Sequence, residues 1–174
     1  MASTLKVNEI QHINGTSAMT IDTNGVVTKP QIPAWRIGLI ADTAETTAGG
    51  NGSPILWDQV SGENNFTSGG ISVDSSTGRI TVPVTGIYQI NANIRFDDIG
   101  SGYILVRIEI NGDSSGDRET YSIEGSPSSS YQTATAVDTF SLTANDYIRI
   151  LAMSSADTSW QVQHFSTCSG FLVG

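Results

Sequence analysis

The chain has 174 residues, of which 38% are hydrophobic and 14% are charged, and its formal net charge is −9. This length suits one domain with a short extension, and an acidic surface repels phosphate backbones, so we expect no nucleic-acid partner. No apolar run reaches the roughly 20 residues needed to cross a bilayer, and residues 1–6 lack an apolar signal core. We therefore expect synthesis in a cytoplasm and no membrane insertion.

Composition also predicts the fold class. The polar residues are dominated by Ser, Thr, Asn and Gly, with 18 glycines, and helix formers such as Lys, Glu and Leu are sparse. Thr fits a pleated sheet, and Gly and Asn accept the positive φ of tight turns, so this mixture indicates short strands joined by turns. The single cysteine, Cys168, excludes an internal disulfide framework and a cysteine-based zinc site.

Residues 1–32 differ from the rest of the chain. They predict one β element at 5–7 and a hairpin in which 18–22 and 26–27 flank an Asn24-Gly25 turn. Prolines bracket the exit and stiffen the connection to the following residues. The segment is too short to bury a core of its own. We expect it either to pack against copies of itself or to dock onto another protein.

The main domain is expected to span residues 33–174. Residues 34–40 predict its first strand, 42–54 a loop rich in Thr, Gly and Asn, and 55–57 a return to the sheet.

The clearest pattern follows, with apolar residues at alternate positions and polar residues between them. Such a period of two indicates strands with one buried face. Gly86 interrupts the run where two strands would meet. The apolar set is Ile80, Val82, Val84, Tyr88, Ile90, Ala92, Ile94 and Phe96.

Later strands follow the same scheme. They are expected at 104–110, 134–142, 148–152 and 165–173, separated by turn-rich stretches at 112–117, 124–130 and 154–159. Several short strands at this spacing favour a β-sandwich or a jelly roll.

Motifs in this domain then become specific. The strongest is 71–88, in which an Asp-x-x-Thr-Gly turn, a Pro-Val pair and a Gly-x-Tyr follow in order. Further pieces lie at 33–39, 55–60, 65–66, 140–148 and 166–173. In this order they resemble the globular head of complement component 1q and the wider tumour-necrosis-factor-like superfamily. The resemblance implies an all-β jelly roll of about ten strands that forms a homotrimer through its inner sheet.

The same resemblance marks Tyr88 and Phe171 as trimer-interface candidates, because family members place aromatics near that interface. Packing in the core of a single chain is an equally good interpretation of each. Cys168 stands where the family has an aromatic residue, and no collagen-like stalk precedes the domain. The immune role of the animal proteins is therefore not transferred.

The N-terminal segment resembles a different group. Residues 3–10 and 18–25 are similar to the openings of structural and fibre proteins of tailed bacteriophages. In those proteins a short N-terminal segment attaches to the virion and a C-terminal β domain faces outward.

Catalytic and metal-binding chemistry has little support in the sequence. His164 and Cys168 lie four residues apart and would share a face of one strand, but no orienting group or oxyanion hole accompanies them. A buried cysteine beside a polar strand residue is the better interpretation. Acidic pairs at 97–98 and at Asp113 and Asp117 lie beside turns, where calcium binding is conceivable but solvated carboxylates are the better interpretation. We therefore expect that the chain is not an enzyme and binds no cofactor other than, at most, a calcium ion.

These observations lead to one hypothesis and two alternatives. The chain is expected to be a bacteriophage structural protein located in the virion, a short tail or head fibre. Residues 1–32 would attach it to other virion proteins, and the trimeric domain 33–174 would adhere to a host-surface glycan or protein through loops at 42–54, 124–130 or 154–159. The alternatives are a capsid-decorating or tail-connecting protein without a receptor role, and a free carbohydrate-binding jelly roll.

Overall fold

A computed structural model describes residues 7–11, 13, 15, 17–29, 32–44, 52–62, 64–97, 102–113, 119–126, 131–155 and 160–174, with the backbone alone at 44 and 119–126. The chain divides into two compact units, residues 1–32 and 33–174. The boundary lies at Pro33, next to the prolines that the sequence places at the exit of the first segment. We call residues 1–32 the N-terminal segment and residues 33–174 the head. Within the described residues all regular structure is β, and none of it is a helix that could span a membrane.

The N-terminal segment forms a small antiparallel sheet in the order β1-β2-β3. Its strands are β1 (Glu9–Gln11), β2 (Ser17–Ile21) and β3 (Val27–Thr28). The predicted hairpin is present. The first strand, however, begins at Glu9 and not at 5–7, because Ile10 pairs with Met19; residues 5 and 6 lie outside the described residues.

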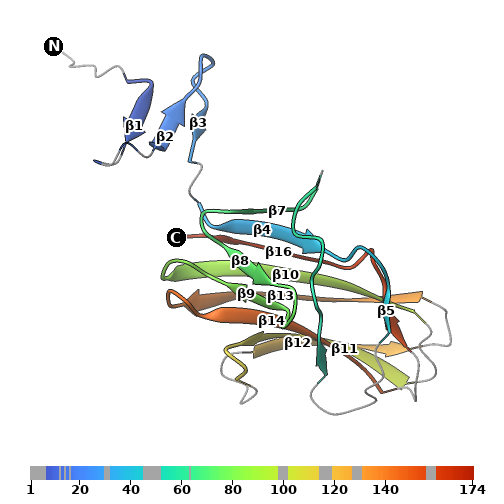
Figure 1. Ribbon diagram of the computed structural model, residues 1–174. Helices are drawn as coiled ribbons and strands as arrows, with labels where there is room; N and C mark the ends of the chain where they lie inside the picture. Colours follow the sequence, from blue (N-terminus) through green and yellow to red (C-terminus); the bar gives the residue numbers. More distant parts are fainter. Residues whose placement is uncertain are drawn as a thin grey trace. The chain divides into compact units, whose positions relative to one another are not determined.

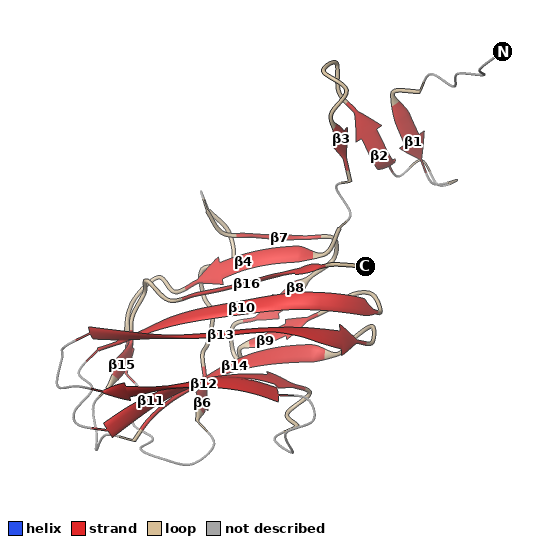
Figure 2. Ribbon diagram, turned by 180° about the vertical axis from the view of Figure 1, so that it is seen from behind, coloured by secondary structure: helices blue, strands red, loops and turns tan. Residues whose placement is uncertain are grey.

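The head consists of two antiparallel sheets (Figures 1 and 2). The first, which we call the β10 sheet, carries the long central strands β10 and β13, which pair along their whole length (Figure 2). Strand β16 lies on the other side of β10, followed by β4 and β7. Its members are β4 (Ala34–Gly38), β5 (Thr43–Ala44), β7 (Phe66–Ser68), β10 (Gly86–Asp97), β13 (Tyr131–Leu142), β15 (Gln161–Val162) and β16 (Thr167–Leu172).

The second sheet, which we call the β14 sheet, has the order β12-β11-β14-β9-β8, with β6 also paired to β14. Its strands are β6 (Ser53–Pro54), β8 (Ser72–Asp74), β9 (Arg79–Thr81), β11 (Gly102–Ile110), β12 (Glu119–Ser126) and β14 (Tyr147–Ser154). Neighbours in each sheet are mostly distant in sequence, which is the connectivity of a jelly roll. The predicted fold class is confirmed.

The core lies between the two sheets and follows the predicted alternation. The even-numbered residues of β10 from Tyr88 to Phe96 are all fully buried, as are Ile104, Val106, Ile108 and Ile110 of β11. Two aromatic pairs fill the space between the sheets: Trp35 with Tyr88, and Phe96 with Trp160, whose ring centroids lie 6.5 and 5.6 Å apart.

One position of the alternating set does not follow the prediction. Val84 remains 42% exposed, because the chain leaves the sheet after Thr81 and re-enters it only at Gly86. The pleat that sets the alternation is therefore interrupted between the two strands. Residues 55–57 are also not a strand, although Ile55 and Trp57 are buried and the amide of Ile55 donates to the carbonyl of Ile150.

The Asp-x-x-Thr-Gly turn is built by one carboxylate. Asp74 accepts hydrogen bonds from the Ser76 amide at 2.9 Å, the Ser76 hydroxyl at 2.6 Å and the Thr77 hydroxyl at 2.7 Å. These bonds, the Ser76 hydroxyl foremost, lower the pKa of Asp74 to about 2. Gly78 closes the turn at φ +69°, where a Cβ atom would overlap the carbonyl oxygen of Ile55. The turn therefore accepts only glycine at this position.

Candidate functional site

Two features of the β10 sheet are candidates for function: its outward face and a polar pocket at one end. The outward face carries the residues that alternate with the core. In the middle of the sheet, Asn91 of β10 lies between Val137 of β13 and Ser169 of β16, and Gln89 lies beside Phe171. We call this surface the outer face; its central residues are Gln89, Asn91, Asn93, Thr135, Val137, Thr139, Ser169 and Phe171.

None of these central residues is charged, and most are exposed; on the same side of the sheet, Arg36 lies beside Ser169 and Arg95 beside Thr133, at the margin of this uncharged centre. Val137 is 50% and Phe171 47% exposed, and Ile87 at the start of β10 adds another aliphatic side chain, 46% exposed. The Thr135 hydroxyl donates to the Asn93 side chain at 3.1 Å, so part of the polar capacity is satisfied within the sheet. An uncharged sheet surface with scattered apolar groups is the composition of an interface core more than of a solvated face.

The structure places the two predicted interface residues, Tyr88 and Phe171, in different environments. Phe171 lies on the outer face and remains an interface candidate. Tyr88 is fully buried in the core of a single chain, where burial raises its pKa and its hydroxyl donates to the Val84 carbonyl at 2.9 Å. A side chain with no exposed surface has none to offer to a neighbour. For Tyr88 the core interpretation therefore fits the structure, because the even-numbered residues of β10 face the core in its register with β13 and β16.

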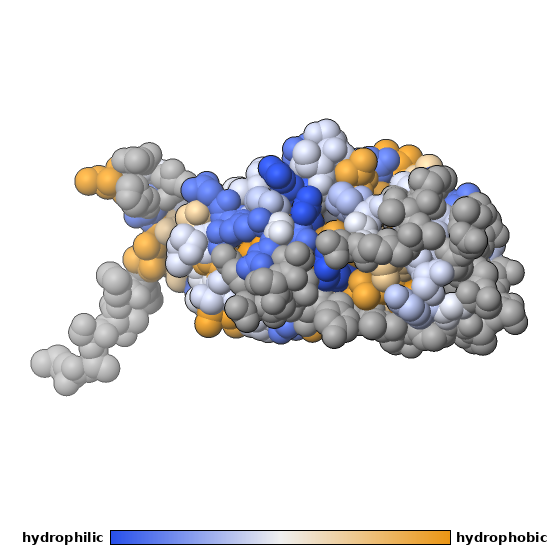
Figure 3. Space-filling model, turned by 90° about the horizontal axis from the view of Figure 1, so that it is seen from below, coloured by the Kyte–Doolittle hydropathy of each residue, from blue (hydrophilic) through white to orange (hydrophobic). Residues whose placement is uncertain are grey.

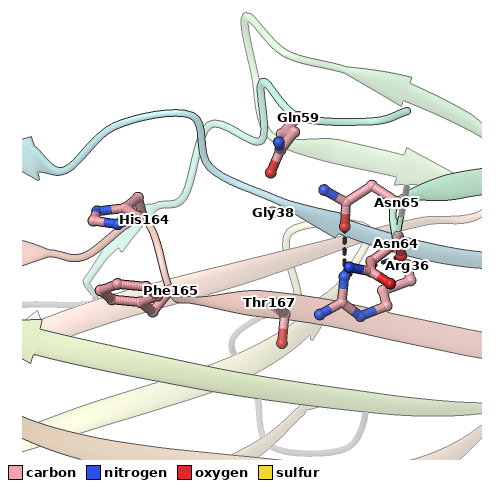
Figure 4. Close-up of a pocket in the computed structure, with 8 residues that line it drawn as sticks. All are labelled: Arg36, Gly38, Gln59, Asn64, Asn65, His164, Phe165 and Thr167. Carbon is pink, nitrogen blue, oxygen red and sulfur yellow. Dashed lines mark hydrogen bonds between the residues drawn. The ribbon is translucent and has the colours of Figure 1, made fainter. Parts of the chain in front are cut away.

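The pocket has a volume of about 430 Å³. It lies where β4 ends and β16 begins, and its lining comes from three separate stretches of sequence (Figure 4). Those stretches are 36–38, 59–65 and 164–167. The lining residues are Arg36, Gly38, Gln59, Asn64, Asn65, His164, Phe165 and Thr167.

Hydrogen bonds position the two ends of this pocket. Arg36 donates to the Asn64 carbonyl at 3.0 Å and to the Asn65 side chain at 2.8 Å, and Asn65 is itself buried (Figure 4). At the other end both the amide and the ring Nδ1 of His164 bond to Asp42, at 2.8 and 2.6 Å. The hydrogen bond from the His164 amide is the main cause of the lowered pKa of Asp42.

Phe165 supplies the aromatic surface of the pocket. It is 60% exposed, its ring centroid lies 4.0 Å from that of His164, and the Arg95 guanidinium lies 5.2 Å from its centre. A cation, amides and an exposed aromatic ring form a set that suits a polar ligand with a stacking face. Sequence reasoning missed this site, since no local motif links its three stretches.

His164 and Cys168 do not share a face of one strand, so that expectation is wrong, whereas the expected burial of Cys168 is confirmed. His164 lies in the turn before β16, outside the strand, and points to Asp42, whereas Cys168 is fully buried beneath Trp35, whose Nε1 donates to Sγ at 3.5 Å. Burial raises the pKa of the Cys168 thiol to about 12. The thiol is therefore protonated at neutral pH and is not a nucleophile.

The acidic pairs considered for calcium lie partly outside the described residues, which omit Asp98 and Asp117. Asp97 accepts a hydrogen bond from the Gln163 side chain at 3.1 Å. Within the described part of the chain no three Asp, Glu, His or Cys residues gather as a metal site. Most of each predicted contact loop, at 45–51, 127–130 and 156–159, also lies outside that part.

Figure 3 shows another side of the head, where apolar residues appear as small patches among hydrophilic ones.

Comparison with known proteins gives no match to a family model and none to a curated protein sequence. Solved structures do match. The head is similar to the globular domain of zebrafish complement 1qA protein, with a TM-score of 0.57 and 14% identity over 82% of this chain and 98% of that one.

Two further structures are tumour-necrosis-factor-like. Eiger TNF from S. frugiperda has a TM-score of 0.60 and 14% identity, over 83% of this chain and 94% of that one. Murine APRIL has a TM-score of 0.56 and 19% identity, over 81% of this chain and 98% of that one. At these identities the likeness shows the fold, and the head of this protein has the jelly-roll fold of the complement 1q and tumour-necrosis-factor-like proteins.

Proposed function

We propose that this chain is a non-enzymatic structural protein of a bacteriophage particle, a short fibre. Its head forms a homotrimer that adheres to the host surface, and its N-terminal segment attaches the trimer to other virion proteins. The observation that carries the proposal is the outer face, a sheet surface with an uncharged, partly apolar centre on a chain of net charge −9. Such a face is unsuited to permanent exposure and suited to contact with identical copies.

Trimerisation gives adhesion a physical mechanism. Three heads on one stem present each contact three times at high effective concentration, so individually weak contacts act together. The division of the chain into a small N-terminal segment and a large head agrees with this arrangement. The resemblance of residues 3–10 and 18–25 to phage fibre openings supports the location in a virion.

The test of the trimer is the solution mass of Val137→Lys. Val137 is half-exposed at the centre of the outer face, so a single chain tolerates lysine there, whereas a trimer would have to bury three charges. We expect the unaltered chain to have three times the mass of one chain in light scattering, and Val137→Lys to dissociate. Ser72→Lys, an exposed strand position of the β14 sheet, is the matched control and should remain trimeric. An unaltered chain that is monomeric at all concentrations contradicts the proposal.

The test of attachment is deletion of residues 2–32. We expect the remaining head to fold and trimerise but to be missing from particles assembled in its presence. Normal incorporation would contradict the anchoring role. Labelling the protein in intact particles then separates a fibre from a capsid-decorating or tail-connecting protein, because an adhesive head must lie at an exposed tip.

The pocket favours carbohydrate binding as a second candidate function. Its amides, its guanidinium and the exposed ring of Phe165 are the groups that hydrogen-bond and stack against sugars. Glycan-array binding by the isolated protein, reduced by Phe165→Ala and unchanged by Ser72→Lys, would support it. The absence of any glycan signal above background would contradict it.

A further inference from the structure

The N-terminal sheet has one apolar and one polar face. In its register Ile10 lies opposite Met19, and Ile21 lies opposite Val27, so these four side chains share one side. We call this side the aliphatic face. Glu9, Thr20 and Thr28 occupy the other side. There the Ser17 hydroxyl donates to Glu9, and the Thr20 and Thr28 hydroxyls bond to each other, so the polar face is satisfied within the sheet.

The turn between β2 and β3 fixes which residues form the aliphatic face. The Asp22 carboxylate accepts the amides of Asn24 and Val26, both at 2.8 Å, and Gly25 takes φ +81°. The Asp22 amide also donates to the Val26 carbonyl at 3.0 Å. A slip by one residue would break this set of bonds and move Val27 to the polar side. The two-sided pattern is therefore determined by the turn.

Among the described residues of the segment, the aliphatic face remains partly exposed to solvent. None of its described residues is buried, and Ile10 and Val27 are 47% and 49% exposed. A sheet with strands of three, five and two residues and no core is not independently stable. Apolar residues are also visible on the surface of the segment in Figure 3. The sheet therefore needs another apolar surface packed against its aliphatic face.

We propose that the occupant is the same face of two further copies of this chain, so that three N-terminal sheets enclose a second, separate hydrophobic core. This inference rests on the proposed head trimer. The face bears four uncharged aliphatic or thioether side chains, which neither repel a copy nor select a different partner. The polar face remains outside, available for attachment to the particle.

Chain connectivity supports identical copies as the occupant. The chain enters the head beside β16, since the amide of Leu172 in that strand donates to the Pro33 carbonyl at 2.9 Å. Only residues 29–32 separate β3 from Pro33, a reach of about 14 Å when fully extended. A head trimer formed through the outer face of that sheet therefore tethers three N-terminal sheets at an effective concentration of about millimolar. A different protein that bound the aliphatic face would have to displace the two neighbouring N-terminal sheets that the head trimer holds close by.

The test compares two variants of the full chain, each with one added cysteine. Met19→Cys places a thiol on the aliphatic face and Thr20→Cys places one on the polar face of the same strand, while the native Cys168 is buried and unreactive. Under mild oxidation we expect Met19→Cys to give disulfide-linked dimers on denaturing gels without a change in native mass. Thr20→Cys should remain uncrosslinked.

A second pair of variants measures how strongly the amides of the N-terminal sheet are protected from exchange with solvent. Val27→Asp puts a charge on the aliphatic face, and Thr28→Asp puts the same charge on the polar face one residue later. Hydrogen exchange at the amides of 19–21 should accelerate by about tenfold or more in Val27→Asp and by less than about threefold in Thr28→Asp, which loses only the bond between the Thr20 and Thr28 hydroxyls.

The outcomes separate this inference from the proposed function. A trimeric protein in which neither cysteine crosslinks, or both do equally, overturns the shared core and leaves the head trimer intact. Crosslinking of Met19→Cys only to another protein in assembled particles also overturns it. A monomeric full chain overturns the head trimer and, with it, this inference.

Discussion

Gly170 of β16 is the position at which one added carbon should most disturb the head. A Cβ atom there would lie 2.7 Å from the Gln89 carbonyl oxygen and closer still to Cζ2 and Cη2 of Trp35. Trp35 is 1% exposed and has no space to move into, and the Gln89 carbonyl belongs to a strand paired on both sides. The φ of Gly170 is not positive, so the effect of Gly170→Ala is steric and not conformational.

The expected loss is at the upper end of that for overpacked cores, about 3 kcal/mol. With a urea dependence of about 2 kcal/mol/M, the unfolding midpoint should fall by about 1.5 M. The melting temperature should fall by about 6–12 °C for a chain of this length. Urea titration followed by tryptophan fluorescence, at one fixed protein concentration, measures the midpoint.

A double-mutant cycle tests the cause. Trp35→Phe removes the two ring carbons that the new methyl would overlap, so Gly170→Ala should destabilise the Trp35→Phe variant by at least about 1 kcal/mol less than it destabilises the unaltered chain. Ser72→Ala, at an exposed strand position of the β14 sheet, is the control and should change stability by less than about 0.5 kcal/mol. Additive effects of the two substitutions, or a Gly170→Ala variant as stable as the unaltered chain, would refute the steric argument.

Two further predictions concern groups with shifted pKa values. Asp74 has a pKa of about 2 in the folded chain against an ordinary 3.8, so it stabilises the fold fully above that ordinary value and loses its contribution as the pH falls toward 2. The difference in urea midpoint between the unaltered chain and Asp74→Ala should therefore shrink from pH 5 to pH 2, and a constant difference would contradict the role of the ionised carboxylate. The Cys168 thiol, buried and with a pKa of about 12, should resist alkylation by iodoacetamide at pH 8 in the folded protein and react once urea unfolds it. Rapid labelling of the folded chain would show that β16 opens locally.

Local features of the sequence determined the fold class and the long strands β10, β11, β13 and β14, but not β12, whose last residues fall in a stretch expected to be a turn. The alternation from Ile80 to Phe96 predicts a buried and an exposed face because side chains in a strand point to opposite sides. Asp74, Thr77 and Gly78 form the expected turn because all of its bonds lie within five residues. The boundary near residue 32 followed from a proline-flanked change in composition. These are short-range effects, and a sequence read in order contains them.

Tertiary structure decided what the sequence left open. Whether Tyr88 faces the core or a neighbour depended on how β10 pairs with β13 and β16, and Val84 left the alternation where the sheet is interrupted. The pocket joins residues 36–38, 59–65 and 164–167, and the separation of His164 from Cys168 depends on Asp42, more than a hundred residues away in the chain. A site assembled from distant strands has no local period or spacing, because the register between those strands is set by packing of the whole core.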